Sequence, residues 1–355
     1  MNFTTTPSVS HDEAANLIVT CGANNTFLFQ AQPGVGKSAL LKTVQRKLKW
    51  EPEQFVYIDG ALLDLGDLQM TLVDKDTNTV RFVPNVMFAH NKPVVVMLDE
   101  LGKAMRPVFN ALLTMLLEHR VGNTRLPEGS IVFATTNLAT DGVGDAIQAH
   151  ARNRITTVRY RNPTADEWIN WASTNDVAPE VMAWVNEYPH CLDSYADAPD
   201  GVVDNPYIFD PRKQQTAYVT PRSLELASHI IKRRANIPQA ALIAALSGTI
   251  GESAARDMQA YLDLADALPS WAAVMRDPDT TPVPDNPIAC TILALGAVTR
   301  MTAQTVEPWM TYMVRLPKEI QFLFSQQAVR NPGVAATLHK SAAYRNWATE
   351  NLQYI

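Results

Sequence analysis

The chain has 355 residues, of which 46% are hydrophobic and 19% are charged. This composition supplies apolar side chains for sizeable cores, and it excludes a disordered or low-complexity chain. Thirty Lys and Arg against thirty-six Asp and Glu give a net charge of −6. That balance excludes a protein that coats nucleic acid through bulk positive charge and leaves only a local basic patch open.

The cysteines and the amino-terminal segment indicate the compartment. Cys21, Cys191 and Cys290 are odd in number and far apart, so we expect reduced thiols rather than a disulfide frame or a zinc site. The first residues lack a basic region followed by an apolar one, so we expect no signal peptide. Apolar runs stay short of the roughly 20 residues that span a membrane. These features predict a soluble cytoplasmic protein with no membrane partner.

Short apolar runs in the first 160 residues predict a parallel sheet. Val94–Leu98 is apolar at successive positions, which is typical of a strand covered on both faces in an α/β fold. Lys37–Lys49 and Met105–His119 carry apolar residues at helical spacing and predict helices between the strands. The five predicted strands are Thr26–Ala31, Phe55–Asp59, Val94–Asp99, Ser130–Thr136 and Thr156–Tyr160.

Helical periodicity dominates after Tyr160. Thr164 followed by Glu167 predicts a capping box at the start of a helix. Further on, Thr220 and Pro221 supply an N-cap and a helix-starting proline, which place Arg222 near the positive end of another helix.

The segment Ala31–Ser38, AQPGVGKS, lies between a predicted strand and a predicted helix and has the pattern of a phosphate-binding loop. Gly34 and Gly36 let the backbone curl so that its N–H groups point at a phosphate. Lys37 can reach the β- and γ-phosphates, and the Ser38 hydroxyl can bind Mg²⁺. We assign nucleotide binding to Gln32, Pro33, Gly34, Val35, Gly36, Lys37, Ser38 and Ala39.

Two carboxylates end the third predicted strand. Asp99 is suited to hold Mg²⁺ together with Ser38, and Glu100 to polarise the water that attacks the γ-phosphate. The alternative is that both acids cap the helix that starts near Leu101. Asn137, at the end of the next strand, can hold the attacking water without adding charge. A guanine-reading NKxD segment is missing from the sequence, which disfavours a GTPase.

These ordered motifs resemble those of the AAA+ ATPases, and their amino-acid sequences resemble those of the MoxR branch. AQPGVGKS is similar to Walker A, VVVMLDE to Walker B, and Asn137 to the sensor 1 residue. The stretch from Leu101 to Asn137 resembles the MoxR run between those motifs, including a hairpin before sensor 1. DAIQAHARNRITTVRY resembles the segment with the arginine finger, which falls on Arg154 with Arg152 as a near alternative. TPRSLELA resembles the sensor 2 helix, with Arg222 as the sensor.

The resemblance covers roughly residues 15–235 and carries expectations for the whole chain. It implies a P-loop AAA+ core with a five-stranded parallel sheet over residues 1–160 and an all-α lid with sensor 2 over 161–250. A further helical region follows over 251–355. It also implies a hexameric ring of subunits in which Arg154 acts across the interface. The resemblance further implies ATP and Mg²⁺ as cofactors and a protein client. In the MoxR branch that partner often carries a von Willebrand factor A domain.

The segment Asp59–Phe82 lies where similar ATPases carry pore loops and an inserted hairpin. Leu68, Gln69, Met70 and Leu72 are candidate pore-facing residues, and Asp76–Thr79 is a candidate hairpin turn. A surface hairpin with a buried apolar face is the equal alternative.

The function that follows is ATP hydrolysis by an oligomeric machine, a chaperone-like ATPase, that remodels or assembles a protein partner. One rival is a DNA-linked AAA+ ATPase of the replication or transposition type. The other is a nucleotide-gated scaffold with little turnover. Nucleic acid is the weaker partner, because the basic clusters Lys42–Lys49 and Lys232–Arg234 lie at predicted helix ends, where basic residues complement the helix dipole.

Overall fold

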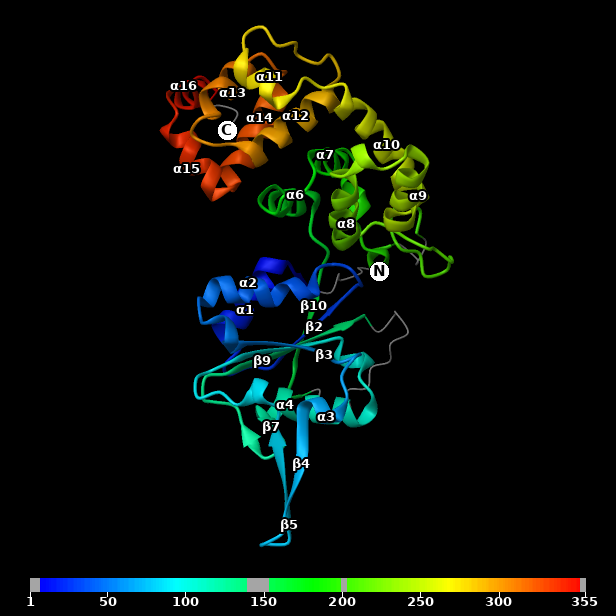
Figure 1. Cartoon of the computed structure of the whole chain (residues 1–355), viewed down its shortest axis with the longest axis vertical. Helices are drawn as coiled ribbons and strands as arrows, with labels where there is room; N and C mark the ends of the chain where they lie inside the picture. Colours follow the sequence, from blue (N-terminus) through cyan, green and yellow to red (C-terminus); the bar gives the residue numbers. More distant parts are fainter. Residues whose placement is uncertain (1–6, 139–152, 199–202, 352–355) are drawn as a thin grey trace, which may run out of the picture. The chain divides into compact units, whose positions relative to one another are not determined.

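The chain folds into two compact units, Met1–Asn162 and Pro163–Ile355 (Figure 1). A computed structural model describes residues 7–138, 153–198 and 203–351. The first unit is built on a parallel sheet with helices on both faces, and the described part of the second unit consists of helices and loops.

The sheet of the first unit has six strands in the order β1-β10-β2-β9-β6-β3. All five predicted strands are confirmed, and the sheet has one more strand than predicted. The additional strand, β1, is two residues long and pairs with β10 at the edge, so it is too short to leave a period in the sequence. The strands are β1 (Ser8–Val9), β2 (Phe27–Ala31), β3 (Phe55–Asp59), β6 (Val95–Asp99), β9 (Ile131–Asn137) and β10 (Thr156–Tyr160).

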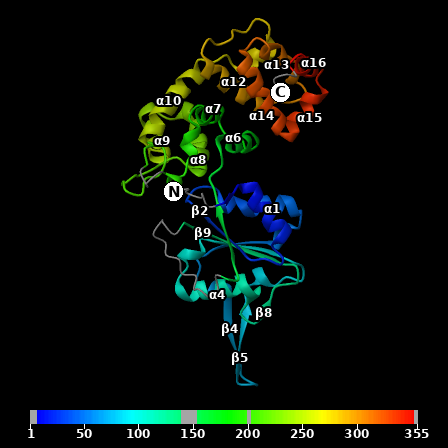
Figure 2. The ribbon, with the colours of Figure 1, turned by 180° about the vertical axis from the view of Figure 1, so that it is seen from behind.

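Different helices cover the two faces of this sheet (Figures 1 and 2). Helices α1 (His11–Cys21) and α2 (Leu40–Leu48) pack on the face that carries Phe29, Met97 and Phe133. The short α3 (Leu65–Leu68) and the longer α4 (Arg106–Glu118) pack on the opposite face. Every residue of β6 is buried, which is why its sequence is apolar without alternation.

Two hairpins extend this unit. Strands β4 (Gln69–Asp74) and β5 (Thr79–Pro84) form a long antiparallel hairpin that projects away from the sheet (Figures 1 and 2). Its turn covers residues 75–78, one residue earlier than predicted, because Thr79 already pairs with Asp74. Strands β7 (Arg120–Val121) and β8 (Thr124–Arg125) form the small hairpin that was expected before the sensor 1 strand.

The second unit packs around two apolar cores. One is centred on Trp184 and joins α6, α7, α8, α9 and α10, and the other is centred on Trp309 and joins α12, α13, α14 and α16. The predicted capping boxes are present at Thr164, before α6, and at Thr220, before α8. The helices are α6 (Ala165–Thr174), α7 (Pro179–Glu187), α8 (Pro221–Ile231), α9 (Gln239–Ile250), α10 (Glu252–Asp266), α11 (Trp271–Arg276), α12 (Pro287–Arg300), α13 (Val306–Met313), α14 (Lys318–Arg330), α15 (Pro332–Lys340) and α16 (Ala342–Glu350). Across the described ranges, every helix is too short or too polar to cross a membrane.

A half-buried histidine links three elements of the first unit. His11 lies 2.7 Å from the Tyr160 hydroxyl through Nδ1 and 2.7 Å from Thr43 Oγ1 through Nε2, so it ties α1 to β10 and to α2. Burial lowers the pKa of His11 below its ordinary value of 6.5; Asp12 opposes this shift, and Arg46 and Lys47 add to it.

This lowered pKa predicts an acid-sensitive contribution to stability. As the pH falls below 6.5, the unfolded chain takes up a proton that folded His11 resists, so stability is full above that pH and decreases through the window beneath it. We expect the urea midpoint of the wild type, followed by circular dichroism, to fall more steeply below pH 6.5 than that of His11→Gln. The same pH dependence in both proteins would contradict this role, because the other histidines titrate in both.

Candidate functional site

The phosphate-loop segment bends back on itself between β2 and α2. Gly34 and Gly36 have φ values of 79° and 95°, in the left-handed region that favours glycine. A Cβ on Gly36 would meet no atom within 4 Å, so its backbone conformation, and not crowding, requires glycine there. This geometry leaves open space in front of the backbone at the start of the helix, as a bound phosphate needs.

Lys37 is buried in this loop and is 5% exposed. Its Nζ donates to the Gln32 carbonyl at 3.1 Å and to Asn137 Oδ1 at 2.6 Å, and lies 4.0 Å from Glu100 Oε1. The structure therefore brings together four predicted site residues from three separate stretches of the chain, Gln32 and Lys37, Glu100, and Asn137.

Asp99 is the centre of the site and accepts from four donors. Its Oδ2 accepts from the Ser38 hydroxyl at 2.7 Å and from the Tyr57 hydroxyl at 2.9 Å. Its Oδ1 accepts from the Thr135 hydroxyl and from the Glu100 N–H, the latter at 3.1 Å. The residue is 3% exposed, so these bonds hold a buried carboxylate in one orientation.

The alternation of side chains along the strands explains why these groups meet. Asp99 is two residues beyond Met97, and Thr135 is two residues beyond Phe133, on the face that α1 and α2 cover. Tyr57 pairs with Met97 in the register of β3 and β6, so it lies diagonally beside Asp99 on that same face.

Sequence reasoning missed Tyr57 and the role of Thr135. The Tyr57 side chain is 46% exposed, yet its hydroxyl faces Asp99. Burial, the hydrogen bond to Asp99 and the charge of Asp99 raise the pKa of Tyr57 to about 12, so its hydroxyl stays protonated and remains a donor. The strand Phe55–Asp59, which carries Tyr57, can be predicted from the sequence. Its place beside β6, which brings Tyr57 to Asp99, cannot.

Glu100 follows the strand in a left-handed conformation with φ 52°. Its side chain makes no cap hydrogen bond to the 3₁₀ turn Leu101–Lys103, so the interpretation of Glu100 as a helix cap is wrong. Its Oε2 instead lies 3.1 Å from Lys103 Nζ, an ion pair within the segment that follows β6. The Glu100 side chain is 21% exposed, although its Oε2 atom is buried, and Oε1 is the oxygen that faces Lys37.

The residues present fit a nucleotide with its divalent cation. The Ser38 hydroxyl and the Asp99 carboxylate are hard oxygen groups of the kind that Mg²⁺ prefers, and they already touch each other. The curled backbone, the buried Lys37 and the start of α2 supply the donors and the positive charge that a polyphosphate needs. Among the other assigned residues, Gln32 and Val35 are buried, and Pro33 and Ala39 are half-buried.

Within the first unit, Arg154 lies apart from this cluster. Arg154 is exposed and precedes β10, whose first residue, Thr156, pairs with Phe27 at the start of β2. It therefore lies at the amino-terminal edge of the sheet, opposite the edge where the phosphate loop follows Ala31. Arg222 is exposed in the first turn of α8, in the second unit. Arg152, the alternative finger, lies outside the described residues.

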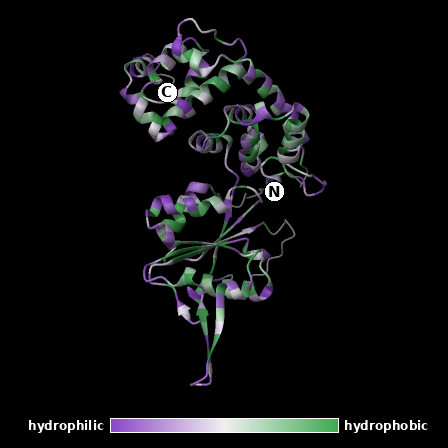
Figure 3. Ribbon diagram, viewed as in Figure 1, coloured by the Kyte–Doolittle hydropathy of each residue, from purple (hydrophilic) through white to green (hydrophobic). Residues whose placement is uncertain are grey.

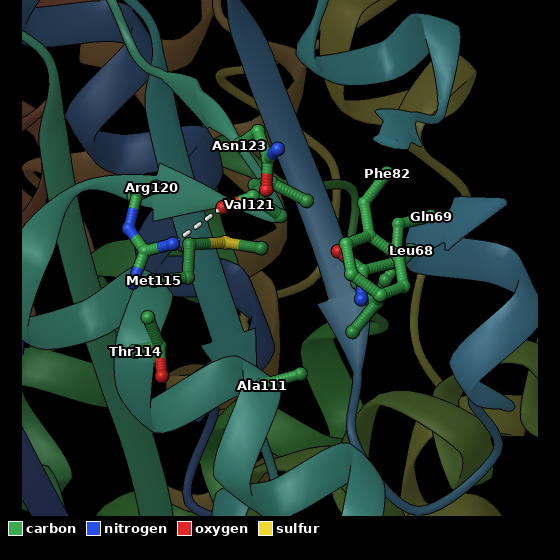
Figure 4. Close-up of a pocket in the computed structure, with 10 residues that line it drawn as sticks. Leu68, Gln69, Phe82, Ala111, Thr114, Met115, Arg120, Val121 and Asn123 are labelled. Atoms are coloured by element: carbon green, nitrogen blue, oxygen red, sulfur yellow. Dashed lines mark hydrogen bonds between the residues drawn. The ribbon is translucent and has the colours of Figure 1, made fainter. Parts of the chain in front are cut away.

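A separate cavity of about 240 Å³ lies beside the long hairpin (Figure 4). It is lined by Gln69 and Phe82 from the base of β4–β5, by Met115 from α4, and by Arg120 and Val121 from β7. Arg120 donates to the Gly122 carbonyl at 2.6 Å and also contacts Glu118, so its guanidinium is held at the rim.

The projecting part of the hairpin exposes apolar residues on both faces, and hydrophobic residues occur along both strands (Figure 3). Met70 and Val73 are each 66% exposed, and Phe82 is 41% exposed. Leu68 is 1% exposed inside the core, so its prediction as a pore-facing residue is wrong; the chain turns inward there to anchor the hairpin. The alternative of a surface hairpin with one buried face is also wrong for the projecting part.

The fold and this cluster define a nucleotide-binding unit of the phosphate-loop class. Residues 27–161, most of the α/β unit, match the model of the ATPase family associated with various cellular activities (AAA). The prediction of an α/β AAA core followed by a helical region is confirmed.

Solved structures similar to this chain include the RuvB Holliday junction branch migration motor of Thermotoga maritima. That similarity has 14% sequence identity and a TM-score of 0.37, and covers 86% of each chain. A mutant of Thermotoga RuvB is similar at 13% identity, with the same coverage and TM-score. No curated protein matches the chain.

The left-handed Gly36 gives a test of the phosphate loop. A side chain in this conformation costs about 1–2 kcal/mol, so in Gly36→Ala the loop backbone should move away from the conformation that binds phosphate. We therefore expect the affinity for Mg-ATP to fall about tenfold. Gly66→Ala is the matched control, since Gly66 in α3 also has open space around its Cβ position but is not left-handed. Titration with a fluorescent ATP analogue checks both variants, and equal affinities would rule out the proposed loop geometry.

Proposed function

We propose that this protein is an ATP-hydrolysing AAA+ machine of the MoxR type that assembles into a ring and remodels a protein partner. The observation that carries the proposal is the cluster in which Lys37, Ser38, Asp99, Glu100 and Asn137 converge on one edge of the sheet. These groups are the ones that phosphoryl transfer to water requires.

Each residue has a role that follows from its position. Lys37 exchanges its carbonyl and amide partners for the β- and γ-phosphates, and Ser38 and Asp99 hold Mg²⁺, which neutralises the phosphate charge when bound. Glu100 accepts a hydrogen bond from the attacking water and directs it at the γ-phosphate. Asn137, once released from Lys37, holds the same water through its amide.

The place of Arg154 supports catalysis across a subunit interface. Arg154 lies near the start of β2, and the phosphate loop follows the end of that strand. The five residues of β2 span roughly 16 Å. An arginine at the opposite edge of the sheet cannot reach the phosphates of its own chain, so a neighbouring subunit would receive it. We therefore propose a closed ring, which the resemblance makes a hexamer, with Arg222 as the sensor that responds to the γ-phosphate in the same chain.

Mixed rings give a direct test of this arrangement. Glu100→Gln leaves the ATP site intact but removes the base, and Arg154→Ala removes the finger, so each variant alone should lose hydrolysis by about a hundredfold or more. In an equal mixture, about a quarter of the sites should pair an intact Glu100 with an intact Arg154 from the neighbour, and that share of turnover should return. Phosphate release measures it.

The matched control is a mixture of Glu100→Gln with Glu100→Ala. Every site in those rings carries a defect in its own chain, so no activity should return. Equal recovery in both mixtures, or full activity of Arg154→Ala alone, would contradict a finger supplied in trans. Full activity of Glu100→Gln would instead favour a different base, and absence of turnover in the wild type would favour the nucleotide-gated scaffold.

The long hairpin supports a protein client rather than nucleic acid. Its exposed side chains on both faces include Met70, Leu72, Val73, Val80 and Phe82, and the strands carry few charges. An isolated two-stranded hairpin is marginally stable in water, and large exposed apolar patches mark protein interaction sites. We propose that the hairpin contacts the client, and the MoxR resemblance makes a von Willebrand factor A domain protein the first client to test.

The response of ATP turnover to different polymers tests the client class. We expect casein, an unfolded polypeptide, to raise the turnover of the wild type, and the double variant Met70→Ser, Val73→Ser to lose that response because it removes one apolar side chain from each hairpin face. Lys75→Ser, at the exposed turn, is the control that should keep it. Stimulation by DNA that weakens steeply with salt, with no effect of casein, would favour the DNA-linked alternative.

A further inference from the structure

Four groups donate to Asp99, and three of them belong to the phosphate loop or to the ends of neighbouring strands. The fourth, Tyr57, is not explained by phosphate-loop chemistry. Ser38 belongs to the loop, Thr135 is part of the strand that ends at Asn137, and the Glu100 N–H is the next backbone group. Tyr57 comes from β3, at the edge of the sheet. Its hydroxyl nevertheless donates at 2.9 Å to the same Oδ2 atom that accepts from Ser38.

Packing alone does not account for this tyrosine. Its side chain is 46% exposed, whereas its neighbours Val56 and Ile58 point into the opposite core and are 7% and 2% exposed. The Tyr57 hydroxyl donates a hydrogen bond to Asp99, and this bond holds the ring against the site rather than against the core.

The two oxygens of Asp99 are held in different ways. Oδ1 accepts from the buried Thr135 and from the backbone, so it belongs to the rigid interior of the sheet. Oδ2 faces the half-buried Ser38, on the side from which a cation would approach, and Tyr57 is its second donor. Loss of the Tyr57 hydroxyl would leave Oδ2 held by the Ser38 hydroxyl alone.

We propose that Tyr57 is a positioning residue for the divalent cation of the bound nucleotide, acting through Oδ2 of Asp99. This inference rests on the proposed ATP site. The tyrosine hydroxyl holds Oδ2 at the Ser38 hydroxyl, and its oxygen keeps lone pairs that could accept a hydrogen bond from cation-bound water. Tyr57 thereby keeps both the carboxylate and the outer hydration shell in the arrangement that Mg²⁺ requires.

The test compares binding with and without the metal, using Tyr57→Phe in the full-length protein. This change removes one oxygen and keeps the ring. We expect the Mg²⁺ concentration for half-maximal binding of a fluorescent ATP analogue to rise about tenfold, as is typical when an outer-shell partner of a metal ligand is removed. Binding of the same analogue in EDTA should stay unchanged, because the hydroxyl that is removed contacts Asp99 and Ser38, whose oxygens would hold the cation and not the phosphates.

Tyr160→Phe is the matched control. It removes another tyrosine hydroxyl of the same unit, the one 2.7 Å from His11, and should leave the Mg²⁺ requirement as in the wild type. An unchanged Mg²⁺ requirement in Tyr57→Phe would overturn the inference while leaving the ATP site in place. Equal weakening with and without metal would also overturn it and would assign Tyr57 a structural role. Failure of the wild type to bind the nucleotide under either condition would overturn the proposed function as well.

Discussion

The fold of the first unit depends on how it accommodates one buried carboxylate, that of Asp99. Asp99 is 3% exposed at the end of a strand whose other residues are apolar, and an unpaired charge there would carry a large desolvation cost. Four donors offset that cost, and they come from the phosphate loop, from β3, from β9 and from the backbone that follows β6. The neighbouring strands must therefore keep their order and register for the charge to be tolerated. The same constraint that secures the fold also assembles the site.

A second set of contacts holds the cluster ready for a polyanion. Lys37 is surrounded by carbonyl oxygens, by the Asn137 amide and by Glu100, so its positive charge is satisfied within the folded protein. Its partners are largely neutral acceptors, which a phosphate can replace with stronger, charge-assisted bonds. Glu100 in turn lies between Lys37 and Lys103, on a backbone turn of left-handed conformation. Replacement of one partner of Lys37 would thus also change the surroundings of Glu100 and Asn137.

Much of this organisation could be predicted from the sequence, and the failures have a common cause. The strand Val94–Asp99 is predictable because its residues are apolar at successive positions, and α2 because its apolar residues recur at helical spacing. Helix α8 is predictable because Thr220 and Pro221 supply an N-cap and a helix-starting proline. The meeting of Lys37 with Asn137 follows from strand ends and motif order. Tyr57 was missed because its role depends on which strand lies beside β6, and a single sequence does not contain that information. The burial of Leu68, a candidate pore-facing residue, could not be predicted because burial at a hairpin base depends on tertiary packing and not on local pattern.

The order of the strands has a consequence for how the protein folds during synthesis. β2, which carries the phosphate loop, pairs with β9 and β10, which follow it by about a hundred residues or more, whereas β3 and β6 lie closer together in the chain. A growing chain can thus form the β3–β6 pair early, but β2 has no partner until β9 leaves the ribosome. Through that interval its apolar residues stay unpaired and open to aggregation. The nucleotide site is completed only when β9 has been made, so a chain truncated before residue 131 would retain the whole Walker A motif and still lack the sheet that shapes it.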